Sequence, residues 1–111
     1  MRKFLPVIFV CAMLCACATT STKIPLLSQK QISVMSAPEV NSFYQAKNQE
    51  LLEQLVYERG GSYYDRLNYV FNNMNAEVAA LAKSPVTKEE YYLKLKSIVE
   101  KYRKRLNYAL K

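Results

Sequence analysis

The 111-residue chain has no histidine and no tryptophan, and it has only two glycines, four prolines and three cysteines. Without histidine, a metal site or a general base would have to be built mainly from carboxylates, and these are scattered along the chain. So few glycines and prolines disfavour a turn-rich β fold and favour helices. No set of residues typical of an active site is present, so the sequence predicts a non-enzymatic protein without metal or cofactor.

The positive charge of the chain is concentrated at its C-terminal end. The net charge is +7, and Arg2 and Lys3 contribute to it close to the N-terminus. Residues 17–87 contain six basic and six acidic residues, whereas residues 88–111 contain eight basic and three acidic ones. A chain of this length forms one domain at most. The excess positive charge is therefore expected at one end of that domain.

An uncharged apolar run follows the first basic residues. Arg2 and Lys3 precede residues 4–16, a pattern typical of the n-region and h-region of a secretory signal. The run is too short for a comfortable membrane span, which needs roughly 20 apolar residues. We therefore expect residues 1–16 to be a cleaved signal peptide. The alternative is an uncleaved N-terminal anchor or a buried helix.

The run closes with Leu14-Cys15-Ala16-Cys17. These residues resemble the lipobox of bacterial lipoproteins, with Leu three residues before the modified cysteine and a small residue directly before it. The resemblance implies a thioether-linked diacylglycerol on Cys17, cleavage before it and acylation of the new N-terminus. Cleavage would remove Cys11 and Cys15, so the mature chain would have no free thiol for a disulfide or a metal.

The same resemblance implies a location. In enteric-type bacteria, a lipoprotein that lacks Asp directly after the lipidated cysteine is sorted to the outer membrane, and Ala18 follows Cys17 here. Two or more acyl chains hold a protein stably on a bilayer. We expect a lipid-anchored protein of the bacterial cell envelope, on the outer membrane facing the periplasm. Export disfavours nucleic acid as a partner despite the positive charge.

Residues 17–35 predict a lipidated N-terminus followed by a flexible linker. A polar stretch begins at Thr19, and Pro25 blocks a helix. The apolar residues of this segment either lie against the folded part or form one short extended segment. Fully stretched, the linker would reach on the order of 60 Å.

Capping signals predict an all-α fold for residues 36–111, a small antiparallel three-helix bundle. Capping boxes begin at Ser36 and Thr87, and Gly60-Gly61 is a helix stop. The expected helices span about 36–59, 62–83 and 87–110. Short connections favour up-down-up order. The alternative is a looser helical hairpin that completes its core in an oligomer.

The tyrosines and the basic C-terminus are the candidate contact residues. Most of the nine tyrosines are expected at the edge of the core, with the alternative of a glycan or partner surface around Tyr69 and the end of the bundle. The basic side chains near the C-terminus either form a solvated face or contact anionic envelope polymers or lipid phosphates. The candidates for that contact are Lys101, Arg103, Lys104 and Arg105.

Lys101-Tyr102-Arg103-Lys104 and the terminal Lys111 also resemble the tail of the major murein lipoproteins. This resemblance implies covalent attachment to peptidoglycan through Lys111. The body of the chain departs from that family, because Gly60-Gly61 and Pro85 interrupt what would be one continuous heptad helix.

The sequence thus predicts a lipid-anchored envelope lipoprotein with a non-enzymatic structural or accessory binding role in the periplasm. Its expected partners are the membrane through the anchor and an envelope protein or peptidoglycan, with an oligomer as a further option. The alternative is an exclusion or immunity-type lipoprotein that binds and blocks an incoming apparatus or toxin.

Overall fold

The computed structural model describes residues 23–111. The expected signal peptide and Cys17 lie outside the described residues. Within them, all regular structure is helical, which confirms the predicted all-α bundle. The elements are α1 (Gln29–Ser33), α2 (Ala37–Arg59), the 3₁₀ turn η2 (Gly61–Tyr63), α3 (Tyr64–Ala82) and α4 (Lys88–Ala109).

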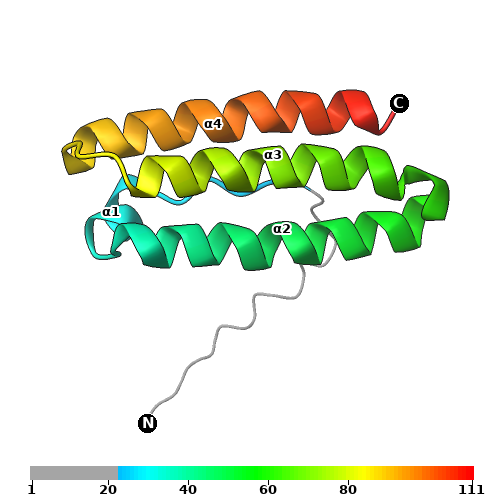
Figure 1. Cartoon of the computed structure of the whole chain (residues 1–111), viewed down its shortest axis with the longest axis horizontal. Helices are drawn as coiled ribbons and strands as arrows, with labels where there is room; N and C mark the ends of the chain where they lie inside the picture. The colour runs from blue at the N-terminus through cyan, green and yellow to red at the C-terminus, as the bar shows by residue number, and fades with distance from the viewer. Residues whose placement is uncertain (1–22) are drawn as a thin grey trace, which may run out of the picture.

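The three long helices run antiparallel to their neighbours, with α3 in the middle (Figure 1). α2 and α4 each pack along α3. This is the predicted up-down-up order, and it places the end of α4 beside the start of α3. Among residues 23–111, none of the helices has the length and apolarity needed to span a bilayer.

The ends of α2 and the start of α4 follow from local chemistry that the sequence shows. Ser36 Oγ accepts from the Glu39 N–H at 3.3 Å, and Glu39 Oε1 accepts from the Ser36 N–H at 2.7 Å, which completes a capping box. Thr87 and Glu90 form the same arrangement before α4. Gly60 ends α2 with φ +108°, a conformation that favours glycine.

The start of α3 differs from the prediction. No side chain caps this helix, and the 3₁₀ turn η2 takes up Gly61–Tyr63 before α3 begins at Tyr64. The turn reverses the chain directly after Gly60, so Ser62 lies within it and not at the N-cap position. Asp65 is in the first turn of α3, as predicted, where the helix dipole favours a negative charge.

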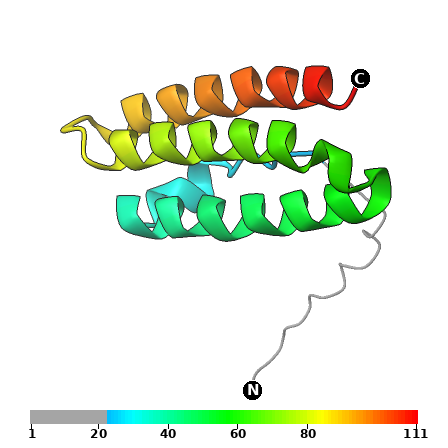
Figure 2. The ribbon, with the colours of Figure 1, turned by 45° about the vertical axis from the view of Figure 1, so that its right-hand side comes forward.

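Residues 23–35, here called the N-terminal strap, are part of the folded domain. The strap passes along the bundle between α2 and α4, on the side opposite the viewer in Figure 1, and Figure 2 shows it from a second angle. Ile24, Leu27 and Ile32 are buried in the same core as the long helices. Where the sequence predicted a flexible linker up to residue 35, the structure therefore shows its apolar residues lying against the folded part.

Tyr44 of α2 holds the extended part of the strap. Its side chain is fully buried, and its hydroxyl donates to the Pro25 carbonyl at 2.9 Å and accepts from the Leu27 N–H at 3.2 Å. Burial raises the pKa of Tyr44, which keeps the hydroxyl protonated as a donor. One buried side chain thus satisfies two backbone groups that form no helix or sheet.

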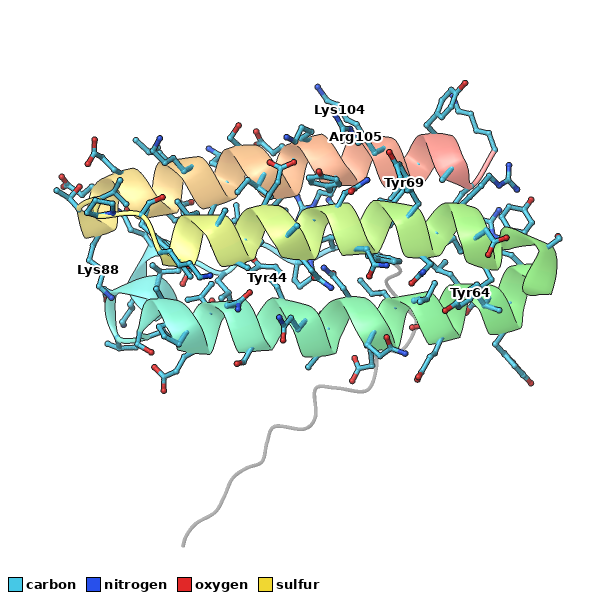
Figure 3. The ribbon with its side chains drawn as sticks, viewed as in Figure 1. Tyr44, Tyr64, Tyr69, Lys88, Lys104 and Arg105 are labelled. Carbon is cyan, nitrogen blue, oxygen red and sulfur yellow. The ribbon has the colours of Figure 1, made fainter. Side chains whose placement is uncertain are left out.

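Two basic residues of α4 bind other carbonyl groups of the strap. Arg103 Nε donates to the Ile24 carbonyl at 2.6 Å. Lys88 Nζ donates to the carbonyls of Ile32 and Met35 at 3.1 and 2.6 Å. In Figure 3, Lys88 extends from the start of α4 toward α1. The strap is therefore attached near both ends of α4.

Candidate functional site

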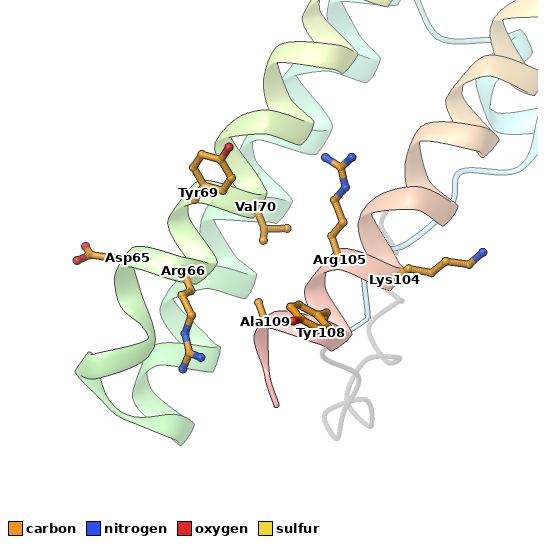
Figure 4. Close-up of a pocket in the computed structure, with 8 residues that line it drawn as sticks. All are labelled: Asp65, Arg66, Tyr69, Val70, Lys104, Arg105, Tyr108 and Ala109. Carbon is orange, nitrogen blue, oxygen red and sulfur yellow. The ribbon is translucent and has the colours of Figure 1, made fainter.

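A shallow groove opens between the first turns of α3 and the last turns of α4 (Figure 4). It has a volume of about 710 Å³. Its lining residues are Asp65, Arg66, Tyr69, Val70, Lys104, Arg105, Tyr108 and Ala109. We call it the α3–α4 groove.

The floor of the α3–α4 groove is apolar and its edges are aromatic. Val70 and Ala109 are buried at the helix contact, whereas Tyr69 and Tyr108 are 70% and 77% exposed. Both tyrosines lie outside the buried apolar stripe of their helix. Exposed rings beside an apolar floor are typical of contact surfaces, because tyrosine can bury area while keeping its hydroxyl in water.

The charge around the groove is mainly positive. Arg66, Lys104 and Arg105 line it, and Asp65 is the single acidic residue among its lining. Arg66 stacks over the ring of Tyr63 at 4.6 Å, which orders its side chain beside the groove. This surface is suited to binding a ligand that has both apolar and anionic groups.

A hydrogen-bonded cluster lies beside the groove, where Glu77 of α3 faces α4. Lys101 Nζ lies 2.8 Å from both carboxylate oxygens of Glu77, and the Tyr102 hydroxyl donates to Glu77 Oε2. Arg105 donates to the Tyr102 hydroxyl at 3.4 Å and stacks over its ring at 5.0 Å. The cluster joins α3 to α4 next to the groove.

The electrostatics of this cluster fix its protonation at neutral pH. Burial would raise the pKa of Glu77, but the hydrogen bonds from Lys101 and Tyr102, with the charges of Lys101 and Arg105, lower it overall. Burial and the adjacent Glu77 raise the pKa of Tyr102 to about 12. The carboxylate is thus charged and the phenol neutral, which describes a structural ion pair with a fixed donor.

The structure separates the four basic residues that the sequence proposed as one contact set. Lys101 is paired with Glu77, and Arg103 is bound to the strap. Lys104 and Arg105 line the α3–α4 groove. Lys111 is exposed and follows α4, with its N–H donating to the Tyr108 carbonyl at 3.2 Å.

The sequence offered a contact surface around Tyr69 as an alternative, and it did not indicate the groove. The groove depends on Val70 and Ala109, which are ordinary apolar positions in their helices. A usable signal was present in both helices: an outward tyrosine directly precedes a small apolar residue at Tyr69-Val70 and Tyr108-Ala109. Only the pairing of α3 with α4 shows that the two signals meet.

Within residues 23–111, no group of three or more Cys, Asp or Glu side chains gathers where it could hold a metal ion. The groove residues offer stacking, apolar contact and positive charge, which are means of binding. No protein-family model, curated protein or solved structure matches this chain.

Proposed function

We propose that this chain is a bacterial lipoprotein, anchored to the envelope through Cys17, with a non-enzymatic structural or accessory binding role in the periplasm. The single observation that carries the proposal is the lipobox-like Leu14-Cys15-Ala16-Cys17 at the end of a signal-like apolar run. The helical domain supports it, because the buried strap begins only a few residues after Cys17. A folded domain close behind a lipidated cysteine would be displayed at the membrane surface.

The α3–α4 groove is the binding surface in this proposal. Tyrosine and arginine are over-represented among the residues that dominate binding energies at protein interfaces. Tyr69, Tyr108 and Arg105 line the groove with the apolar floor between them. The groove would take an envelope component that combines an apolar segment with carboxylate or phosphate groups.

Metabolic labelling with a radioactive or alkyne-tagged fatty acid tests the anchor. The Cys17→Ala variant should lose the label and accumulate as an unprocessed precursor. Cys15→Ala is the matched control, because it changes the neighbouring cysteine of the same motif and should keep the label. Label that persists in Cys17→Ala, or that is lost only in Cys15→Ala, would contradict the proposal.

The second candidate is an exclusion or immunity-type lipoprotein, and the open apolar floor of the groove favours it, because a specific protein partner would cover that floor. A photo-crosslinking amino acid at Tyr108 should then capture one defined protein in intact cells. The same probe at Leu93, which is 62% exposed on α4 away from the groove, is the control. An envelope protein of the same cell captured at Tyr108 supports the accessory role, whereas an incoming toxin or apparatus protein supports exclusion.

A further inference from the structure

The docked strap determines how far the folded domain can move from a lipid anchor. Ile24 is fully buried, and its carbonyl is bound by Arg103. Only residues 18–23 separate it from Cys17. At about 3.3–3.6 Å per residue, the chain from Cys17 to Ile24 reaches at most about 25 Å. The domain is therefore held much closer to the bilayer than a free linker of residues 17–35 would hold it.

The chain leaves the domain beside the basic end of α4. Lys23 and Ile24 line a small depression together with Arg103, Leu106 and Asn107. Because Arg103 lies about two turns before the end of α4, the exit point is on the C-terminal part of that helix. The anchor would therefore draw this part of α4 toward the membrane before any other.

An exposed stripe begins at this exit point. Lys104 and Asn107 are exposed and lie three residues apart on one side of the C-terminal part of α4, and Lys111 is exposed just beyond the end of that helix at Ala109. In Figure 4, Lys104 points away from α3 and from the groove floor. Among the described residues, Lys47 and Lys101 form ion pairs with carboxylates, whereas Lys104 and Lys111 do not. The nearest acidic residue along the stripe is Glu100, one turn before Lys104.

We infer that this stripe, here called the exit face, lies against the surface of the bilayer that holds the anchor, with Lys104 and Lys111 on the phosphates of anionic lipids. The inference deepens the proposed function and rests on it, because it takes Cys17 as the point of attachment. Tyr108 beside the stripe suits the same position, since tyrosine rings favour the membrane–water interface. Basic side chains are attracted to anionic lipid surfaces within about a Debye length, roughly 10 Å at 0.1 M salt.

The tether favours the bilayer over a soluble polymer or protein as the occupant of the exit face. A tether this short keeps the lipid surface at a high effective concentration, so a contact too weak to bind free vesicles is still occupied. The groove opens toward α3 (Figure 4). Lys104 and Tyr108 also line the groove, so the exit face and the groove share the α4 edge, whereas Asp65, Arg66 and Tyr69 line the α3 edge.

The inference can be tested on residues 17–111. This part of the chain contains the whole described core, and Cys17 is its sole thiol. Coupled through that thiol to a maleimide lipid in nanodiscs, it acquires an anchor independently of the cell. Gadolinium-chelating lipids then broaden the amide NMR signals nearest the bilayer. In discs containing phosphatidylglycerol at low salt, we expect the strongest broadening over residues 103–111 and the weakest over 83–90. High salt or phosphatidylcholine alone should weaken this gradient to the part that the tether alone produces.

Charge reversal supplies the matched variants. Lys104→Glu combined with Lys111→Glu should weaken the gradient in anionic discs to the part that the tether alone produces. Lys83→Glu combined with Lys94→Glu changes the same number of charges on exposed lysines at the other end of the domain and should preserve it. Circular dichroism of each variant first confirms its helical content, so a loss of folding is not mistaken for a loss of orientation.

Equal broadening at both ends, or a gradient that the exit-face variant keeps undiminished, would overturn the inference. A gradient independent of lipid charge, together with signal shifts at Lys104 on adding soluble peptidoglycan fragments, would assign the exit face to a polymer instead. Failure of Cys17 acylation in cells would refute the proposed function, whereas it would not change the nanodisc result. The two outcomes are therefore distinguishable.

Discussion

Tyr44 shows how a single residue ties the strap to the bundle. Its hydroxyl satisfies the Pro25 carbonyl and the Leu27 N–H in the core. Tyr44→Phe keeps the ring but leaves both groups without this partner, so we expect a loss of about 1–3 kcal/mol in the free energy of unfolding. Urea denaturation measures it. Tyr57→Phe is the control, because Tyr57 is 91% exposed and its hydroxyl makes no described contact.

A loss at Tyr44 no larger than at Tyr57 would mean that the strap is not bound through this hydroxyl. The comparison is strict because both changes remove one oxygen from a tyrosine on the same helix. Only the change at the buried Tyr44 should lower the free energy of unfolding.

Glu77 gives a residue-scale prediction about pH. Its pKa is lower in the folded protein than its ordinary value, so its contribution to stability is complete above the unfolded pKa and is lost as pH falls through the folded value. Glu77→Gln should therefore lower the unfolding free energy at pH 7. The difference from the unsubstituted protein should shrink as pH falls below 4.5, the ordinary value.

Urea titrations at pH 7 and at several pH values below 4.5 measure this difference. Glu50→Gln is the matched control, because Glu50 forms an exposed pair with Lys47 on one helix at 3.1 Å, and such pairs contribute little. A Glu77→Gln effect that persists undiminished in acid would show that the lost contact is not the ion pair with Lys101.

At the scale of elements, the three long helices could be predicted because their signals are local. Ser36 and Thr87 cap their helices through residues three positions away, and Gly60 ends α2 through its own backbone conformation. The strap could not be predicted in the same way. Ser28 and Gln31 form a real capping box, but the five-residue helix that they start is too short to show an apolar period.

The strap also makes its decisive contacts far along the chain. Ile24 meets Arg103, which is 79 residues away, and Leu27 meets Tyr44. No spacing rule in the sequence links such positions. Its apolar residues were visible as unusual for a spacer, and burial in the core is the reason for them.

Ile24→Ala tests whether the strap is an integral part of the fold. Ile24 is fully buried at the end of the strap, and replacing a buried Ile by Ala typically costs about 2–5 kcal/mol. Val34→Ala, at an 82% exposed position of the same strap, should change the unfolding free energy by less than about 0.5 kcal/mol. Thermal or urea unfolding of both variants makes the comparison. Equal, small effects of the two substitutions on the unfolding free energy would mean that residues 23–35 are a linker and not part of the fold.

At the scale of the whole molecule, the charged C-terminus divides into parts that the sequence could not separate. Lys101 is neutralised by Glu77, 24 residues away, and Arg103 is bound to the strap. These two partners come from other elements. The sequence of α4 alone therefore cannot distinguish its paired basic residues from its solvent-exposed ones. The sequence thus singled out this end of the molecule as the candidate site. The packing holds Arg105 against Tyr102 and leaves Lys104 and Lys111 exposed for contacts with other molecules.

The same packing places Ile24, seven residues after the proposed attachment point Cys17, beside the C-terminal part of α4. Ile24 is bound by Arg103, and the six residues from Arg103 to Ala109, the end of α4, rise only about 9 Å along the helix. The chain from Ile24 to Cys17 reaches at most about 25 Å. In a continuous helix with the lipid anchor at one end and the terminal lysine at the other, the length of the helix separates the membrane from the cell wall. Here, Arg103 binds the strap at Ile24, seven residues after Cys17, on the same part of α4 that Lys111 follows.

We therefore expect Lys111 to contact the bilayer and not to be joined to peptidoglycan. Sacculi boiled in detergent and digested with lysozyme should release no form of this chain on immunoblots. Deleting Lys111 should leave the amount of fatty-acid-labelled protein unchanged, because the lysine lies outside the core and far in sequence from the processing site. A ladder of muropeptide-bearing bands that disappears in the deletion variant, and is kept by Lys104→Ala, would establish the covalent link and would require the exit face to turn from the bilayer toward the cell wall.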